Sequence, residues 1–187
     1  MRLRILGMLS FIVLTTATIQ AQELPEFPGP EKEHQWLHQF VGEWATHSKA
    51  DMGPDLPTME CDGSISSRMI GGLWALNEIK GDMAGTPMTG IQTIGYDAAK
   101  KKYIGTWVDS MVNYMWHYEG TVDSTGKILT LDAEGPNYSA GGKITKFQDI
   151  YEFKSADEIA LFSKMLGDDG KWITFMTGTA KRQKQNQ

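Results

Sequence analysis

Ten short segments with strand-like patterning follow one another along this chain, and they limit its fold more than any other feature. Turn-forming residues separate most of them, as at Gly71-Gly72, Ser124-Thr125-Gly126 and Asp168-Asp169-Gly170. Most joins are short, which favours antiparallel pairing between neighbours in the sequence. The predicted strands cover residues 43–50, 58–70, 73–82, 89–97, 101–110, 113–123, 127–134, 143–154, 158–166 and 171–181.

A long row of antiparallel strands has two exposed edges, which invite aggregation unless they are covered or paired. Closure into a barrel removes both edges at once. A two-sheet sandwich needs longer crossovers, and only residues 135–142 offer one. The sequence therefore predicts an all-β fold, an antiparallel up-and-down β-barrel of about ten strands.

One short helix is predicted ahead of the strands, over about Glu31–Val41, and Gly42 is suited to end it. Leu37 and Phe40 lie on one apolar stripe of this helix, and Trp44 follows in phase. We expect Trp44 to plug the closed end of the barrel by packing on Leu37 and Phe40.

The first residues resemble a secretory signal peptide. Arg2 and Arg4 precede an apolar run, Ile5–Leu14, which is too short to span a bilayer, and Ala21 suits the position before cleavage. An uncleaved membrane anchor is the alternative. We expect an exported protein, periplasmic or extracellular in a bacterium, without a stable membrane anchor after cleavage. The expected organisation is a signal peptide (1–21), an extended lead-in (22–30), a single barrel domain (31–182) and a loose tail (183–187).

Charge and cysteine content exclude several classes of function. The chain has 23 acidic and 18 basic residues, a formal net charge of -5. Nucleic-acid binding requires a basic face, so no nucleic-acid partner is expected. The single cysteine, Cys61, excludes an intramolecular disulfide and a cysteine-based zinc site. Its place in a predicted strand favours burial. The sequence carries no signal for an oligomeric state.

Alternation along the strands predicts which polar side chains face the barrel interior. A buried carboxylate needs a partner such as Arg68, a tyrosine or water. Arg68 is the first cation expected to pair, although its own strand face is polar. An aromatic lining with a few polar groups is typical of a ligand cavity, but a filled core with satisfied polar pairs gives the same pattern. Three carboxylates share a face with large apolar residues: Asp149 with Phe147, Tyr151 and Phe153; Asp109 with Tyr103 and Trp107; Glu78 with Trp74 and Leu76.

His117 lies in a strand with large residues on both faces, so its orientation stays open. A haem-binding barrel could use a lone histidine in this way, whereas a surface histidine is the simpler interpretation. We expect no cofactor, and the catalytic residues, if any exist, are unknown. The predicted ligand-binding residues are Asp149, Tyr151, Trp107, Asp109, Glu78, Arg68 and His117.

Two metal hypotheses have simpler alternative interpretations. His34 and His38 are spaced four residues apart on the predicted helix, so both could face one metal ion, but no third ligand is evident. The methionines could bind copper(I), yet they lack clustered spacing and fill irregular cavities well. We therefore expect no metal site.

Several motifs resemble a known family. The helix running into Gly42-Glu43-Trp44 is similar to the Gly-x-Trp start of lipocalins. Further matches are Gly71-Gly72-Leu73-Trp74, Gly90-Ile91, Gly95-Tyr96-Asp97, Lys102 to Ser110 and the Asp169-Gly170-Lys171 hairpin. Together they resemble the bacterial domain-of-unknown-function family 1579, over about residues 31–182. The resemblance implies a lipocalin-like, calycin-type barrel and brings no catalytic residues.

Three functional hypotheses follow. The leading one is an exported lipocalin-like barrel that binds a small apolar or amphipathic ligand. An enzyme that uses an inward carboxylate in the same cavity is an alternative, although the sequence leans away from an enzyme. A structural or interaction barrel with a filled core is the third. The size of the cavity separates the first two hypotheses from the last.

Overall fold

The computed structural model describes residues 27–51, 57–83 and 85–184. The predicted signal peptide lies outside these residues, as does most of the predicted lead-in. Among the described residues, no helix has the length and apolar character needed to cross a membrane. The elements are α1 (Lys32–Trp36), the 3-10 helix η1 (Leu37–Phe40), β1 (Gly42–Ala50), β2 (Met59–Ile70), β3 (Trp74–Met83), β4 (Thr86–Asp97), β5 (Lys102–Asp109), β6 (Trp116–Val122), β7 (Ile128–Asn137), the 3-10 helix η2 (Tyr138–Ala140), β8 (Lys143–Ser155), β9 (Glu158–Leu166) and β10 (Trp172–Arg182).

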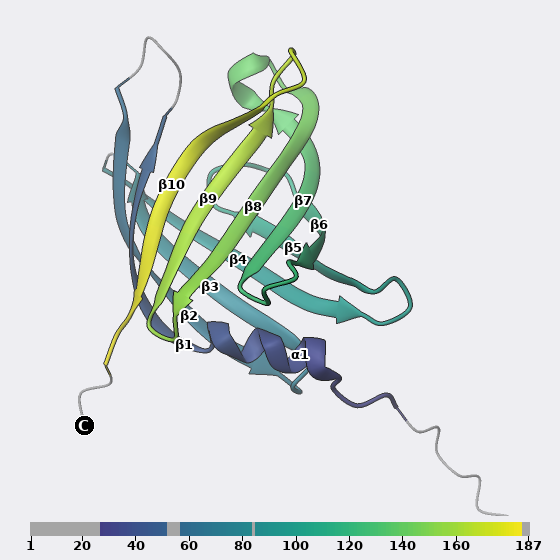
Figure 1. The fold of residues 1–187 in the computed structure, drawn as a ribbon. Coiled ribbons are helices and arrows are strands. Elements are labelled where there is room, and N and C mark those ends of the chain that lie inside the picture. Colours follow the sequence, from purple (N-terminus) through teal and green to yellow (C-terminus); the bar gives the residue numbers. More distant parts are fainter. Residues whose placement is uncertain (1–26, 52–56, 84, 185–187) are drawn as a thin grey trace, which may run out of the picture.

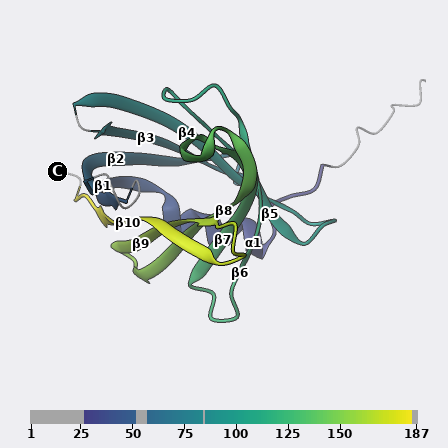
Figure 2. The same cartoon turned by 90° about the horizontal axis from the view of Figure 1, so that it is seen from above.

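The strands form a closed barrel in which each strand pairs antiparallel with its neighbour in the sequence (Figure 1). β1 pairs with β10, for example Trp44 with Arg182, and this pairing closes the barrel. The view from above shows the strands arranged around a common interior (Figure 2). The predicted fold class is confirmed, since each strand lies close to its predicted place.

The N-terminal helical segment lies across the lower end of the barrel (Figure 1). It covers nearly the predicted range, but only Lys32–Trp36 is α-helical, and the chain passes into the 3-10 helix η1 at Leu37. Hydrogen bonds hold it against the barrel. The indole Nε1 of Trp36 donates to the carbonyl oxygen of Gly126 (2.8 Å), and the hydroxyl of Tyr103 donates to that of Glu33 (3.2 Å). We call this end of the barrel the closed end.

Trp44 occupies the closed end, as predicted. Its side chain is 1% exposed and belongs to one buried cluster with Leu37 and Phe40. The indole Nε1 donates to the carbonyl oxygen of Phe40 at 2.7 Å, which satisfies its polar group inside the core. The Arg182 guanidinium lies over the indole ring, 4.1 Å from the ring centroid, and also donates to the Val41 and Gln39 carbonyl oxygens. The last strand is thereby fastened to the helix junction.

Cys61 was expected to be buried and is half-buried instead. Burial along β2 alternates so that Cys61, Ile65 and Ser67 are on the inner face, while Arg68 is on the outer face. Cys61 lies toward the end of the barrel away from α1, where the interior is less completely filled.

Candidate functional site

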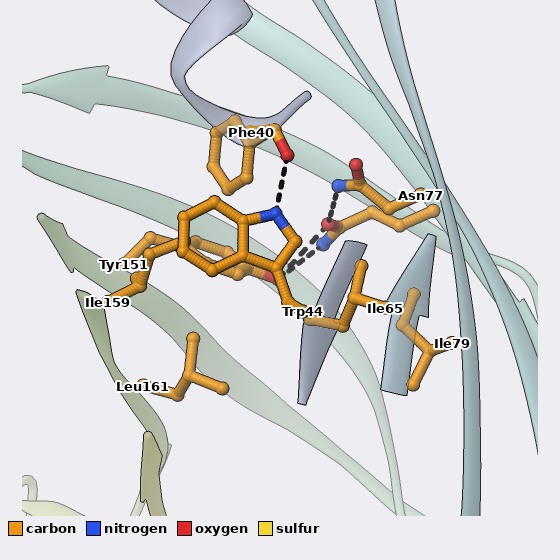
Figure 3. Close-up of a pocket in the computed structure, with 9 residues that line it drawn as sticks. Phe40, Trp44, Ile65, Asn77, Ile79, Tyr151, Ile159 and Leu161 are labelled. Carbon is orange, nitrogen blue, oxygen red and sulfur yellow. Dashed lines mark hydrogen bonds between the residues drawn. The ribbon is translucent and has the colours of Figure 1, made fainter. Parts of the chain in front are cut away.

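A row of polar side chains crosses the barrel interior above the closed end. The hydroxyl of Ser67 donates to the Asn77 Oδ1 atom, and Asn77 Nδ2 donates to Gln92 Oε1 at 2.9 Å. Gln92 Nε2 donates to the hydroxyl oxygen of Tyr151 at 2.7 Å. Figure 3 shows the Asn77 and Tyr151 side chains near Trp44. Asn77 and Gln92 are almost fully buried, and each finds its partner in a neighbouring member of the row.

Asp149, on β8, continues this row of polar side chains. Its Oδ2 atom accepts a hydrogen bond from the Tyr118 hydroxyl (2.5 Å), and its Oδ1 atom accepts one from the Ser163 hydroxyl (2.6 Å). Gln92 also interacts with Tyr118, which joins the two groups into one network. We call this network the polar belt: Ser67, Asn77, Gln92, Tyr118, Asp149, Tyr151 and Ser163.

The carboxyl of Asp149 has no cation beside it in the belt. Removal from water disfavours the charged form and raises the pKa of Asp149, while the hydroxyls of Ser163 and Tyr118 act in the opposite direction. Burial, followed by the negative potential of Asp149, likewise raises the pKa of Tyr118 well above its usual value. The Tyr118 hydroxyl therefore stays protonated and serves as a donor to the carboxyl.

The barrel is nearly filled beside the belt. A cavity of about 20 Å³ lies here, lined by Trp44, Phe40, Ile65, Leu161 and belt residues (Figure 3). That volume holds about one water molecule. A ligand larger than water does not fit between the belt and the closed end.

Above the belt, away from α1, large apolar side chains on the inner face stay only partly buried. The Trp116 ring lies over Gly135, where an added Cβ would come within 2.3 Å of it, and the Trp107 ring covers Gly90 in the same way. Trp116 also meets Phe147 edge-on, with ring centroids 4.9 Å apart. We call the inner-face side chains at this end of the barrel the upper chamber; they include Met88, Trp107, Trp116, Phe147 and Met165.

Four of the predicted site residues face the interior. Asp149 and Tyr151 belong to the polar belt. Trp107 lies in the upper chamber, and its indole Nε1 donates to Asp109 Oδ2 at 2.7 Å. Asp109 Oδ1 accepts from the backbone N–H groups of Met111 (2.7 Å) and Val112 (3.1 Å). Asp109 is thus occupied in shaping the turn after β5, which makes it part of the scaffold.

Three residues predicted to bind the ligand lie on the outer face of the barrel. Arg68 is exposed, so it does not pair with Asp149. Glu78 shares its face with Trp74 and Leu76 as expected, but that face is the outer one, and Glu78 pairs with Lys80 at 2.8 Å. His117 is exposed on β6, where the inner face carries Trp116 and Tyr118. Since it points away from the interior, His117 cannot hold a haem inside the barrel.

The paired-histidine metal hypothesis also fails on geometry. His34 is buried, and its Nδ1 atom accepts the backbone N–H of Glu31 at 3.0 Å. The chain tightens to a 3-10 helix at Leu37, so residues four apart no longer share a face, and His38 is exposed. Within the described ranges, no group of three or more potential metal ligands comes together.

The sequence prediction missed most of the belt. Asn77, Gln92 and Ser163 lie on inner faces, yet short polar residues in strands normally indicate a solvated face. One signal was available for Tyr118, because Tyr114, Trp116 and Tyr118 alternate along one strand. The remaining members are recognisable only when the strands are placed side by side.

The chain is similar in fold and sequence pattern to known proteins. The model of the family described as "Protein of unknown function (DUF1579)" matches residues 29–182. The crystal structure of Rv2717c from M. tuberculosis is similar, with 15% identity and a TM-score of 0.62, over 83% of this chain and 99% of that one. The S-type phycobiliprotein lyase CPES from Guillardia theta is 13% identical, with a TM-score of 0.54 over 85% of this chain and 100% of that one. No curated protein sequence matches.

Proposed function

This chain belongs to the DUF1579 family, and on that barrel fold we propose that it binds one small apolar or amphipathic molecule in the upper chamber. The observation that carries the proposal is the partial exposure of large inner-face side chains, Trp107, Trp116 and Phe147 among them. Aromatic residues inside a barrel gain most when an apolar surface covers them. A ligand would complete their burial.

Two further observations support this location. The closed end is filled, so a ligand inside the barrel would have to lie toward the other end. The polar belt forms the floor of the upper chamber and supplies hydroxyl and carboxyl groups that could orient an amphipathic molecule. We also propose that the protein acts outside the cytoplasm, which is supported by the signal-peptide pattern of residues 1–21.

A structural barrel without a ligand is the competing function, and the filled lower half favours it. The two proposals differ in what the upper chamber does. A scaffold would show no saturable binding there, whereas a binding protein would respond to changes in its walls.

Binding of Nile red, a neutral apolar dye, separates the two proposals in a matched pair of variants. Trp116 and Trp74 each cover a glycine, but Trp116 is inside the barrel over Gly135 and Trp74 is outside over Gly95. We expect saturable binding of one dye per chain, weakened about fivefold or more by Trp116→Ala, because an aromatic contact with the dye contributes about 1 kcal/mol or more. Trp74→Ala should leave dye affinity unchanged.

Fluorescence titration measures both affinities, and thermal melting confirms that each variant is folded. If Trp116→Ala proves unstable, Phe147→Ala tests the same wall. Unsaturable binding, or equal sensitivity to the inner and outer tryptophans, would contradict the proposed function.

A further inference from the structure

Asp149 lies at the boundary between the polar belt and the upper chamber. On β8 the next inner-face residue toward the end away from α1 is Phe147, which packs against Trp116. Across the neighbouring strands, Asp149 pairs with Leu131 and Ser163. Asp149 is half-buried as a residue, and its side chain faces inward. A ligand that contacts Phe147 would therefore lie beside Asp149.

The hydrogen bonds of Asp149 leave it able to accept more. Tyr118 and Ser163 each donate one hydrogen bond, one to each carboxyl oxygen. An ionised carboxylate has about four acceptor positions, so about two remain. The side chain is fixed in place by these two hydroxyls, which favours recognition of a ligand group at a defined point.

The charge around Asp149 is unbalanced. Among the described strand positions that alternate onto the inner face above the belt, the one basic residue is Lys143. Lys143 is exposed at the rim, where its Nζ atom is 2.5 Å from Asp168. The second acidic residue on the inner face, Asp109, adds further negative charge nearer the end of the barrel away from α1. A carboxylate held away from water without a countercharge attracts a cation.

We propose that the ligand of the upper chamber carries a protonated amino group that binds the Asp149 carboxylate. The inference rests on the proposed function and names its ligand class, an amphipathic amine. The apolar part of the amine would contact Trp107, Trp116 and Phe147, and the ammonium would donate to the free acceptor positions of Asp149. Acidic amphipaths such as fatty acids are disfavoured, because their carboxylate would meet Asp149.

Three probes with one carbon skeleton test the charge preference: phenylbutylamine, phenylbutanol and phenylbutyrate. Displacement of bound Nile red measures the affinity of each probe, near neutral pH, for the wild-type chain and for two variants. Asp149→Asn removes the charge on the inner face, and Asp132→Asn is the control on the outer face of β7. Asn keeps the shape of the side chain and strands no charged partner, so we expect the variant to fold.

We expect wild type to bind the amine about tenfold to hundredfold more tightly than the alcohol, as for a hydrogen bond to a charged group. The carboxylate probe should bind most weakly. Asp149→Asn should bring the affinity for the amine down to that for the alcohol, and Asp132→Asn should change neither.

Equal affinities of wild type for amine and alcohol would overturn the inference and leave the proposed function intact, since Nile red and the probes would still bind. An amine preference that persists in Asp149→Asn would also overturn it. Failure of Nile red to bind saturably would instead contradict the proposed function, and the inference with it.

Discussion

Replacing Trp44 with alanine is expected to lower the free energy of unfolding by about 3–5 kcal/mol, the usual cost of removing a large buried aromatic side chain. Trp44 is 1% exposed at the closed end and belongs to the cluster that includes Leu37 and Phe40. Its loss leaves a cavity, removes the hydrogen bond to the Phe40 carbonyl oxygen and takes the ring away from Arg182. Urea denaturation followed by circular dichroism measures the change.

Trp172 provides the control, because it has the same side chain but is 40% exposed at the start of β10. Trp172→Ala should change the free energy of unfolding by about 0.5 kcal/mol or less. Similar losses for the two variants would show that Trp44 does not hold the closed end together.

Replacing Gln92 with alanine is expected to destabilise the barrel by about 2–4 kcal/mol, because a buried polar group left without its partner costs about 1–3 kcal/mol. Gln92 is 1% exposed and connects Asn77 with Tyr151 at the centre of the polar belt. Without it, the Asn77 amide and the Tyr151 hydroxyl lose their shared partner. The same denaturation experiment measures this change.

Gln148 is the matched control for this substitution. It hydrogen-bonds Asp132 at 2.9 Å on the outer face, where water can replace the lost bond. Gln148→Ala should therefore cost about 0.5 kcal/mol or less. If Gln92→Ala were equally mild, the polar belt would not contribute to the stability of the interior.

The strands were predictable because local chemistry defines them. Turn residues such as Gly71-Gly72 and Gly126 mark their ends, and the backbone has positive φ at each of these glycines. Short joins then make neighbouring strands pair, and the pairing of β1 with β10 closes the sheet. The burial of Trp44 followed from the phase of the helix stripe, which is again a local property.

The faces of β3 could not be assigned from its own sequence. Trp74 and Leu76 are apolar but lie outside, because Trp74 packs over Gly95 of the neighbouring strand and covers its backbone. The inner face instead carries Ala75 and Asn77, which are small or polar. The predicted alternation was correct, but the choice of the inner face was reversed, and Glu78 was therefore assigned to the wrong face of the strand.

The polar belt depends on contacts between distant parts of the sequence. Gln92 and Tyr151 are 59 residues apart, and Tyr118 and Asp149 are 31 residues apart. The sequence indicated that Asp149 faces inward and left Arg68, a tyrosine or water open as its partner, whereas the structure shows the Tyr118 and Ser163 hydroxyls in that place. That distinction requires the strand order and the register together.

The most direct test of a ligand site in the upper chamber is nuclear magnetic resonance of the indole N–H groups during titration with phenylbutanol. The chain has six tryptophans, and single substitutions assign their signals. Trp107 and Trp116 lie inside the chamber, whereas Trp74 and Trp172 are exposed on the barrel surface. We predict saturable shifts of the Trp107 and Trp116 signals at one ligand per chain, with the Trp74 and Trp172 signals unchanged. Shifts confined to Trp74 or Trp172, or no saturable shift at all, would contradict the account.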